Sequence, residues 1–163
     1  MRSMRRREKE VTDREEMVRV LETARYVTVA MCGEDGPYLV TLSHCYDHDR
    51  DAIYFHCARE GRKVDILKRD GRVWGQALID LGYADGRCDH LYQTTQFRGR
   101  VTFVDDPAEK RHALEIMVRK NEKEPESVYA EQVTDESVSH VNIGRIDIEL
   151  MTGKRSDRVV VST

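Results

Sequence analysis

The sequence predicts a mainly β protein, an antiparallel barrel with two or three helices at its periphery. Residues of high β propensity recur in about six segments, and most neighbouring segments are joined by hairpin-length turns rich in glycine and aspartate. A parallel sheet would instead need long crossover connections, usually helices. The 163 residues contain no repeat and no dividing linker, so one domain over 1–163 is expected, with 1–10 as a flexible tail.

The first expected element is a helix over 13–25. Thr12 and Glu15 have the spacing of a capping box, and an apolar stripe through Met17 and Leu21 follows at helical spacing. The other elements are expected in this order: strands 26–32, 37–46 and 52–57, a helix after Gly61, strands 72–80 and 91–104 with a bend at Gly99, a helix begun by Asp105-Asp-Pro107, a short helix after 126, and a strand over 138–151. Residues 81–90 are expected to form a loop.

Composition excludes several classes of function. The net charge is −3, with 39% hydrophobic and 35% charged residues, which is typical of a soluble protein without general affinity for nucleic acid. The basic cluster over 2–7 is followed by acidic residues and is interpreted as solvated. No apolar run reaches the roughly 20 residues that cross a bilayer, and the N-terminus lacks the apolar segment of a signal peptide. We therefore expect a cytoplasmic protein with no membrane or nucleic-acid partner.

The cysteines predict no metal site. Buried, reduced thiols are expected at the three cysteines on predicted strands: Cys32, Cys45 and Cys57. The pair His44-Cys45 could be combined with Cys57, Cys88 and His90 on paper, but the spacing matches no zinc motif. Adjacent strand residues also face opposite sides of a sheet, so His44 and Cys45 would point apart.

The strongest functional signal lies in residues 52–67. An apolar strand ends at Cys57, the chain turns through Gly61, and a helix follows whose first turn carries Arg62 and Lys63. A helix start leaves backbone N–H groups unpaired and carries the positive end of the helix dipole. Two cations beside these groups indicate a phosphate site, although exposed cations on a surface helix are the alternative. The glycine spacing of a Walker-type P-loop is missing.

This order of elements, with Tyr54-Phe-His-x-Ala-x-x-Gly-Arg-Lys63 at its centre, resembles the pyridoxamine 5′-phosphate oxidase-like flavoproteins, and among them the nitroimidazole-reductase (Nim) branch most. The opening helix, the segment 36–43 and the segment 97–107 support the likeness. The resemblance implies an antiparallel Greek-key split β-barrel of the FMN-binding type. It also implies a homodimer with FMN at the subunit interface, as would be expected of a barrel whose edge strands need cover.

The resemblance also implies a set of cofactor-binding positions, which follow the flavin from its ring to its phosphate and back: Val40, Thr41, Leu42 and Ser43 (ring, through the backbone), His56 and Cys57 (ribityl chain), Arg62 and Lys63 (phosphate), and Thr94, Thr95 and Gln96 (ring pocket). His56 is the candidate catalytic residue, as a proton donor, because imidazole changes charge near neutral pH. A hydrogen-bonded core histidine is the alternative.

The chain departs from the oxidase at its C-terminus. A pyridoxamine-phosphate oxidase should have a C-terminal Trp and an Arg-Leu-x-Pro-type segment for its substrate phosphate, whereas the only Trp here is Trp74. Oxidation of vitamin B6 is therefore not favoured.

The expected function is an FMN-dependent oxidoreductase that passes electrons from a small-molecule donor to a small organic acceptor, with nitroaromatics as one candidate. A non-catalytic flavin- or haem-binding storage protein is an alternative, with His44, His56 or His90 as an axial ligand. A deazaflavin-dependent reductase is another, in which Arg98 and Arg100 would extend the basic groove.

Overall fold

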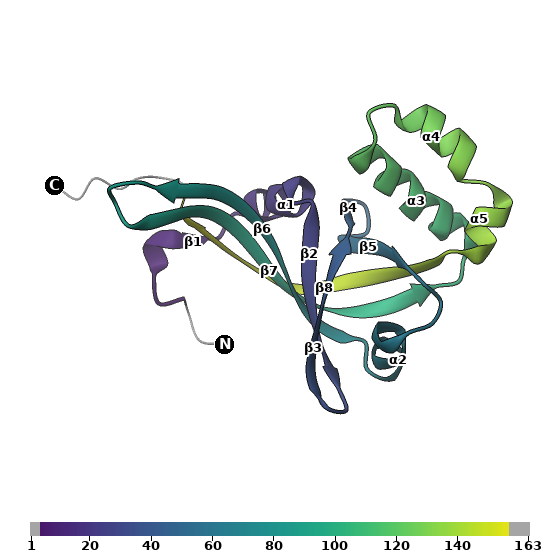
Figure 1. Ribbon diagram of the computed structural model, residues 1–163, viewed down its shortest axis with the longest axis horizontal. Coiled ribbons are helices and arrows are strands. Elements are labelled where there is room, and N and C mark those ends of the chain that lie inside the picture. Colours follow the sequence, from purple (N-terminus) through teal and green to yellow (C-terminus); the bar gives the residue numbers. More distant parts are fainter. Residues whose placement is uncertain (1–3, 157–163) are drawn as a thin grey trace.

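Antiparallel strands form one continuous sheet in the computed structural model, which describes residues 4–156 (Figure 1). Within that range the sheet has eight strands, in the order β3-β2-β6-β7-β8-β5-β4, with β1 paired to β8. Their bounds are β1 Glu10–Val11, β2 Tyr26–Gly33, β3 Gly36–Ser43, β4 Cys45–Asp47, β5 Ala52–Cys57, β6 Arg72–Ala84, β7 Asp89–Val104 and β8 Asn142–Ser156. The sheet curls into a split barrel, so the predicted fold class is confirmed.

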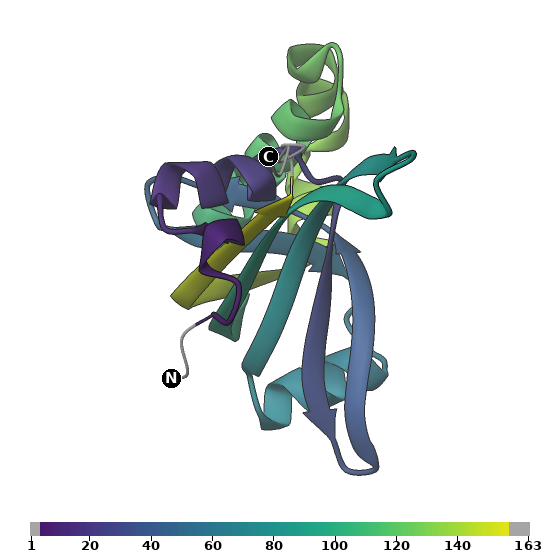
Figure 2. The same ribbon diagram turned by 90° about the vertical axis from the view of Figure 1, so that its left-hand side faces the viewer.

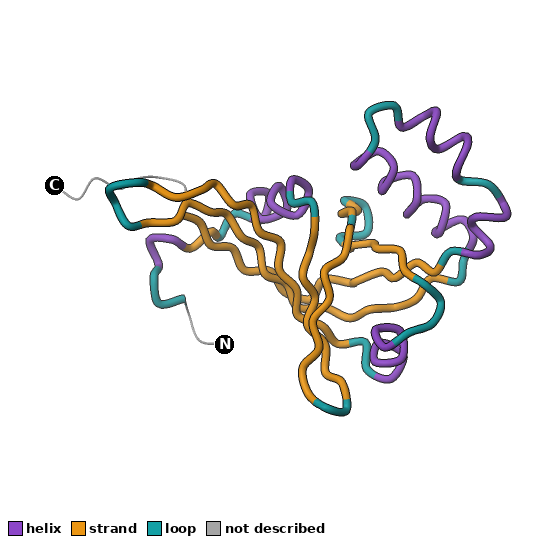
Figure 3. Tube along the Cα trace, in the orientation of Figure 1, coloured by secondary structure: helices purple, strands orange, loops and turns teal. Residues whose placement is uncertain are grey.

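The helices lie at the periphery of this sheet (Figure 3). They are η1 Arg7–Lys9, α1 Arg14–Thr23, α2 Arg62–Arg69, α3 Pro107–Asn121, α4 Pro125–Gln132 and α5 Asp135–His140. Helix α1 lies against β6, β7 and β8, whereas α3 covers β4 and β5 and carries α4 and α5 on its outer side. Helix α2 lies beside the β2–β3 hairpin (Figure 2).

Two apolar cores hold the barrel together. The larger fills the barrel and includes Leu21, Phe55 and Phe97, and the smaller lies between α3 and the sheet and includes Tyr54 and Ile143. Alternate residues of β5 enter different cores, so β5 is buried on both faces over residues 52–55. This explains why its sequence is a continuous apolar run.

The predicted bend at Gly99 is confirmed. The pairing of β7 with β8 shifts register between Arg98 and Gly99, so that Glu149 has no partner across the ladder. A Cβ at position 99 would lie 2.3 Å from the Asp147 carbonyl oxygen, which only a glycine avoids. The start of α3 is also confirmed, with Asp106 as the cap of its first turn.

The N-terminal segment differs from the prediction in two ways. Residues 7–10, placed by the sequence in a flexible tail, form η1 and the start of β1, which pairs with β8. The cap of α1 is Asp13, whose carboxylate accepts from the Glu15 N–H at 3.0 Å, so the predicted Thr12 capping box is wrong. The pairing with β8 joins residues more than 140 positions apart, and local propensity cannot predict such a pairing.

The predicted strand over 37–46 is two strands. It breaks at His44, so that β3 pairs with β2 while β4 pairs with β5. The local sequence has high β propensity throughout, so the break in the strand is set by the tertiary fold and not by local propensity.

The predicted loop over 81–90 is mostly strand. Pairing between β6 and β7 continues to Ala84 opposite Asp89, past an irregularity between Asp80 and Tyr83. The hairpin therefore extends well beyond the barrel (Figure 1). The last predicted strand, over 138–151, begins later than expected. Residues 138–140 belong to α5, and β8 begins at Asn142.

The prediction of buried cysteines holds for Cys45 alone. Burial raises the pKa of the Cys45 thiol to about 12. Cys57 is half-buried, and Cys32 is exposed because it lies on the outer face of β2. Strand propensity at Cys32 does not say which face is covered.

His44, at the break between β3 and β4, is enclosed, with 1% of its surface exposed. Its Nε2 lies 2.7 Å from the Leu21 carbonyl oxygen and 3.2 Å from the Nζ of Lys120 on α3. Burial and the Lys120 charge lower the pKa of His44 from 6.5 to about 4, against the opposing effect of the Leu21 hydrogen bond. The imidazole is therefore neutral in the folded protein at neutral pH.

We expect His44 to make the fold sensitive to acid. Its pKa is lower in the folded than in the unfolded chain, so its contribution to stability is complete above pH 6.5 and is lost as the pH falls towards 4. The shift corresponds to a loss of about 2 kcal/mol between pH 7 and pH 5. Urea unfolding at both pH values should show this loss in the wild type and much less of it in His44→Gln.

The exposed His90 provides the control for this measurement. His90→Gln should keep the full loss. An equal loss in the wild type and in His44→Gln would contradict the assignment.

Candidate functional site

The start of α2 has no side-chain cap. Its N-cap is Gly61, with φ of 126° and no side-chain cap, and the Gly61 carbonyl accepts from the N–H groups of Val64 and Asp65 at 2.8 and 3.1 Å. The N–H groups of Arg62 and Lys63 precede these bonds, at the positive end of the helix. A Cβ at position 61 would meet no atom within 4 Å, so the positive φ, and not a lack of space, accounts for the glycine.

Side chains from three elements meet beside this helix start. The Arg62 guanidinium lies 4.4 Å from the centre of the Tyr38 ring on β3, and its Nη2 is 2.8 and 2.9 Å from the two carboxylate oxygens of Asp35. Burial raises the pKa of the Cys57 thiol at the end of β5, while the nearby Lys63 charge opposes the shift. The structure thus brings Cys57 near Lys63 and places Tyr38 and Asp35 against Arg62. Sequence reasoning missed Tyr38 and Asp35.

The predicted ring residues of β3 alternate in direction. Thr41 and Ser43 lie on the exposed outer face, while Val40 is half-buried and Leu42 is buried on the inner face. Strand β3 is at the end of the sheet and pairs only with β2 among the described strands. The backbone groups along its other edge are therefore unpaired by the sheet, as backbone contact with a ligand would require.

The predicted residues of β7 also divide between the two faces. Thr95 is fully buried, and its hydroxyl donates to the Met17 carbonyl at 2.9 Å. Its backbone lies between β6 and β8, so within one protomer the Thr95 side chain and backbone groups are already engaged, and its contact with a cofactor stays a prediction. Thr94 and Gln96 point outward, and the Thr94 hydroxyl is buried without a hydrogen-bond partner.

His56 is exposed on the face of β5 that carries Tyr54, opposite to Phe55 and Cys57. Because neighbouring strand residues face opposite ways, the structure does not bring the His56 and Cys57 side chains together. His44, considered as a haem ligand, is enclosed with its Nε2 on Leu21, so a haem cannot reach it.

The outer face of the sheet carries rows of side chains that cross the strands. A polar row consists of Thr41, Thr28, Gln76, Gln96 and Thr152, each opposite the next in register. It is flanked by large apolar side chains that are 43–63% exposed: Tyr26, Leu39, Trp74 and Leu78. We call the surface formed by this polar row and its apolar flanks the outer face. Thr41 on β3 and Gln96 on β7 are three strands apart, or about 14 Å at roughly 4.8 Å per strand.

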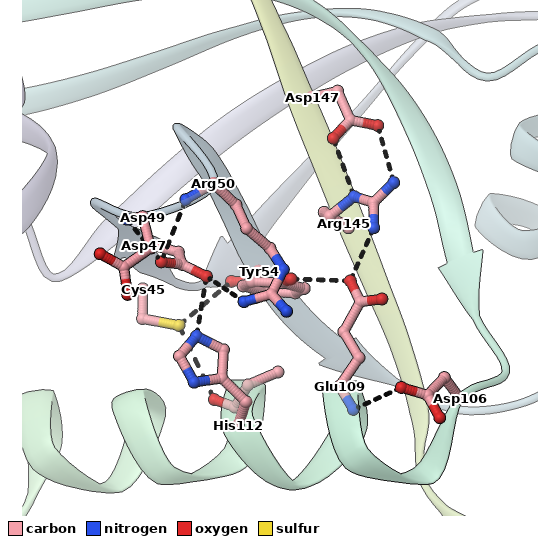
Figure 4. A network of polar contacts seen from close by, with 11 residues as sticks. Cys45, Asp47, Asp49, Arg50, Tyr54, Asp106, Glu109, His112, Arg145 and Asp147 are labelled. Carbon is pink, nitrogen blue, oxygen red and sulfur yellow. Dashed lines mark hydrogen bonds and ion pairs between the residues drawn. The ribbon is translucent and has the colours of Figure 1, made fainter.

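A second cluster of titratable groups fastens α3 to the barrel (Figure 4). The Tyr54 hydroxyl donates to Glu109 at 2.7 Å, and Arg145 bridges Glu109 and Asp147 at 2.7 and 2.8 Å. Burial raises the pKa of Glu109, but the bonds from Tyr54 and Arg145 outweigh it and lower that pKa overall. These groups satisfy one another's hydrogen bonds under α3, so the cluster is structural. No spacing in the sequence predicts it.

Two further observations concern residues 4–156. No three His, Cys, Asp or Glu side chains there gather as a metal site would require. Among the helices that residues 4–156 form, none is long and apolar enough to cross a membrane. Residues 157–163, which carry most of the C-terminal departure from the oxidase, lie outside the described residues.

The fold and these residues define a split-barrel protein with an open β edge next to a basic helix start. The chain belongs to the pyridoxamine 5′-phosphate oxidase family, whose model matches residues 13–155. This confirms the resemblance inferred from the sequence. No curated protein matches the chain.

Solved structures share the fold. A putative 5-nitroimidazole antibiotic resistance protein from Bacteroides thetaiotaomicron is 26% identical, with a TM-score of 0.75 over 91% of this chain and 90% of that one. A flavocytochrome from Azotobacter vinelandii is 13% identical, with a TM-score of 0.76 over 96% and 73%. An FAD- and haem-binding protein from Mycobacterium smegmatis is 16% identical, with a TM-score of 0.75 over 92% and 74%. The last two establish likeness of fold alone.

The opposite orientations of Thr94 and Thr95 predict opposite effects on folding. Thr95→Val should lower the free energy of unfolding by about 1 kcal/mol or more, because the Met17 carbonyl loses its buried donor. Thr94→Val should leave that free energy unchanged or raise it, because its hydroxyl has no partner within the protomer. Urea unfolding of both variants checks the assignment, and equal destabilisation would contradict it.

Proposed function

We propose that this protein is an FMN-dependent oxidoreductase that passes electrons from a small-molecule donor to a small organic acceptor, with nitroaromatics as one candidate. The observation that carries the proposal is the convergence of an uncapped helix start, two cations and an open β edge in a member of this family. The likeness to the putative 5-nitroimidazole resistance protein supports the choice of acceptor.

The residues present fit such a cofactor chemically. Arg62, Lys63 and the N–H groups of the α2 start suit a phosphate dianion. The unpaired edge of β3 offers alternating donors and acceptors to a planar heterocycle, and the Thr94 hydroxyl lacks a partner that a ligand could supply. Bound there, the flavin would supply the hydride and electron transfer chemistry, while the protein would orient it.

In this proposal the imidazole of His56 donates a proton to the reduced acceptor. Its exposed position on β5 leaves the ring accessible to small molecules. Cys57, half-buried and with its pKa raised, would serve as a neutral thiol beside the ribityl chain.

A second copy of the chain completes the proposed site. In one protomer the ring residues of β3 and those of β7 are about 14 Å apart across the sheet, so one ring in contact with both sets needs strands from two protomers. The outer face also exposes Tyr26, Leu39, Trp74 and Leu78, and a symmetric dimer would cover them.

The helix start can be tested by flavin retention. Wild-type protein mixed with FMN and desalted should keep a two-banded flavin spectrum, and Arg62→Ala with Lys63→Ala should lose it, because each lost charge-assisted hydrogen bond weakens binding about tenfold or more. The matched control is Lys68→Ala with Arg69→Ala, which removes the same charges at the other end of α2.

A wild type that retains no FMN would contradict the proposal, and a Soret band would favour the haem alternative. Reoxidation of the photoreduced flavin by a nitroaromatic, faster than its reaction in free solution, distinguishes an oxidoreductase from a flavin-storage protein. Tighter binding of a deazaflavin than of FMN would favour the deazaflavin alternative.

The dimer makes a separate prediction. Leu78→Glu places a charge in the middle of the outer face and should shift the protein to a monomer, with loss of FMN binding, because a buried unpaired carboxylate disfavours the interface. Sedimentation velocity measures the assembly state. Ala130→Glu on the exposed side of α4 adds the same charge elsewhere and should leave the assembly unchanged. A wild-type monomer that binds FMN would refute the shared site.

A further inference from the structure

The β2–β3 turn is tied to α2 by two ion pairs. Asp35 contacts Arg62 on the first turn of the helix, and Glu34 contacts Arg69 on its last turn. The two acids are neighbours in one turn, and the two arginines lie seven residues apart on one side of the helix. These are similar links between the same two elements, but only the Asp35 link involves the proposed phosphate site.

Asp35 occupies the nitrogen on which bidentate binding depends. Both of its oxygens contact Nη2 of Arg62, at 2.8 and 2.9 Å. A guanidinium binds an oxyanion with two parallel bonds either through Nη1 and Nη2 or through Nε and Nη2. Because Nη2 belongs to both pairs, the Asp35 carboxylate on this nitrogen competes with a phosphate for either bidentate arrangement.

We propose that Asp35 is a built-in competitor of the cofactor phosphate for Arg62, which lowers the affinity for FMN and makes the cofactor exchangeable. This inference rests on the proposed function and adds a regulation of the same site. On binding, the phosphate takes Nη2, and the Asp35 carboxylate turns to solvent.

The local structure makes this displacement inexpensive. The Asp35 side chain is 73% exposed, so the carboxylate regains hydration when it leaves Arg62. A cavity of about 350 Å³, lined by the turn and α2, lies beside the ion pair. Gly36, with φ of 119°, ends the turn, so the turn contains a residue of high backbone freedom.

The stacking on Tyr38 decides the direction of the effect. If Asp35 alone held Arg62 in place, its removal would weaken phosphate binding. The guanidinium also lies on the Tyr38 ring, so Arg62 keeps its position when the carboxylate is neutralised. What remains is the gain from freeing Nη2 and from removing a negative charge near the phosphate.

The test compares FMN with riboflavin, which has the same ring and no phosphate. In Asp35→Asn the dissociation constant for FMN should fall about two- to fivefold, the range of an exposed ion pair, while that for riboflavin stays unchanged. Flavin fluorescence quenching measures both, and the gain should shrink at 0.5 M salt. The matched control is Glu34→Gln, which breaks the neighbouring link and should alter neither constant.

Each other outcome is decisive. Weaker binding of FMN to Asp35→Asn, an equal change for riboflavin, or the same gain in Glu34→Gln would overturn the role of Asp35. The gain should also vanish when Arg62→Ala is combined with Asp35→Asn, and its persistence would overturn the proposal. A wild type that binds neither flavin refutes the proposed function itself, and the role of Asp35 with it.

Discussion

Strand β5 lies between two cores, and the placement of the candidate site follows from this burial. Phe55 is enclosed in the barrel and Tyr54 beneath α3, while the ladder with β4 and β8 fixes both edges. A strand held on four sides fixes where the chain leaves the barrel, and the buried residues Val64, Ile66 and Leu67 fix α2 beyond the turn through Gly61. The polar cluster of Glu109 and Arg145 serves the same end, because it keeps α3 against Tyr54.

Local chemistry accounts for what the sequence predicts correctly. The start of α3 is encoded by Asp106 and Pro107, and the bend of β7 by Gly99, where a backbone carbonyl occupies the place of a side chain. The cap of α1 is a local error, one residue from the predicted Thr12, whereas the errors in the strand assignments involve distant pairing. Residues 7–11 become ordered because β8 lies beside them, and 81–84 become strand because Asp89 and His90 pair with the end of β6. The break at His44 has the same origin, because the segment before it pairs with β2 and the segment after it pairs with β5.

The candidate site shows the same division. Arg62 and Lys63 were recognisable because their chemistry depends on their place in one helix. The opposed directions of Thr94 and Thr95 follow from strand alternation, but which of the two is covered depends on α1, more than 70 residues earlier in the chain. Asp35 and Tyr38 carry no motif. They acquire a role only because the β2–β3 hairpin lies beside α2.

The outer face connects the site to the assembly. A polar row between exposed apolar side chains makes a poor core for a single chain, because burying the glutamines and threonines costs free energy. It also makes a poor free surface, because the apolar side chains beside the row would stay exposed to water. Gln96 already donates to Gln76 at 3.0 Å, so part of the row satisfies itself. In the proposed dimer the apolar flanks supply the contact, and the remaining polar groups of the row, together with Thr94 beside it, are left to meet a ligand. The same residues would then stabilise the dimer and shape the ring pocket, which makes cofactor binding and assembly one coupled equilibrium.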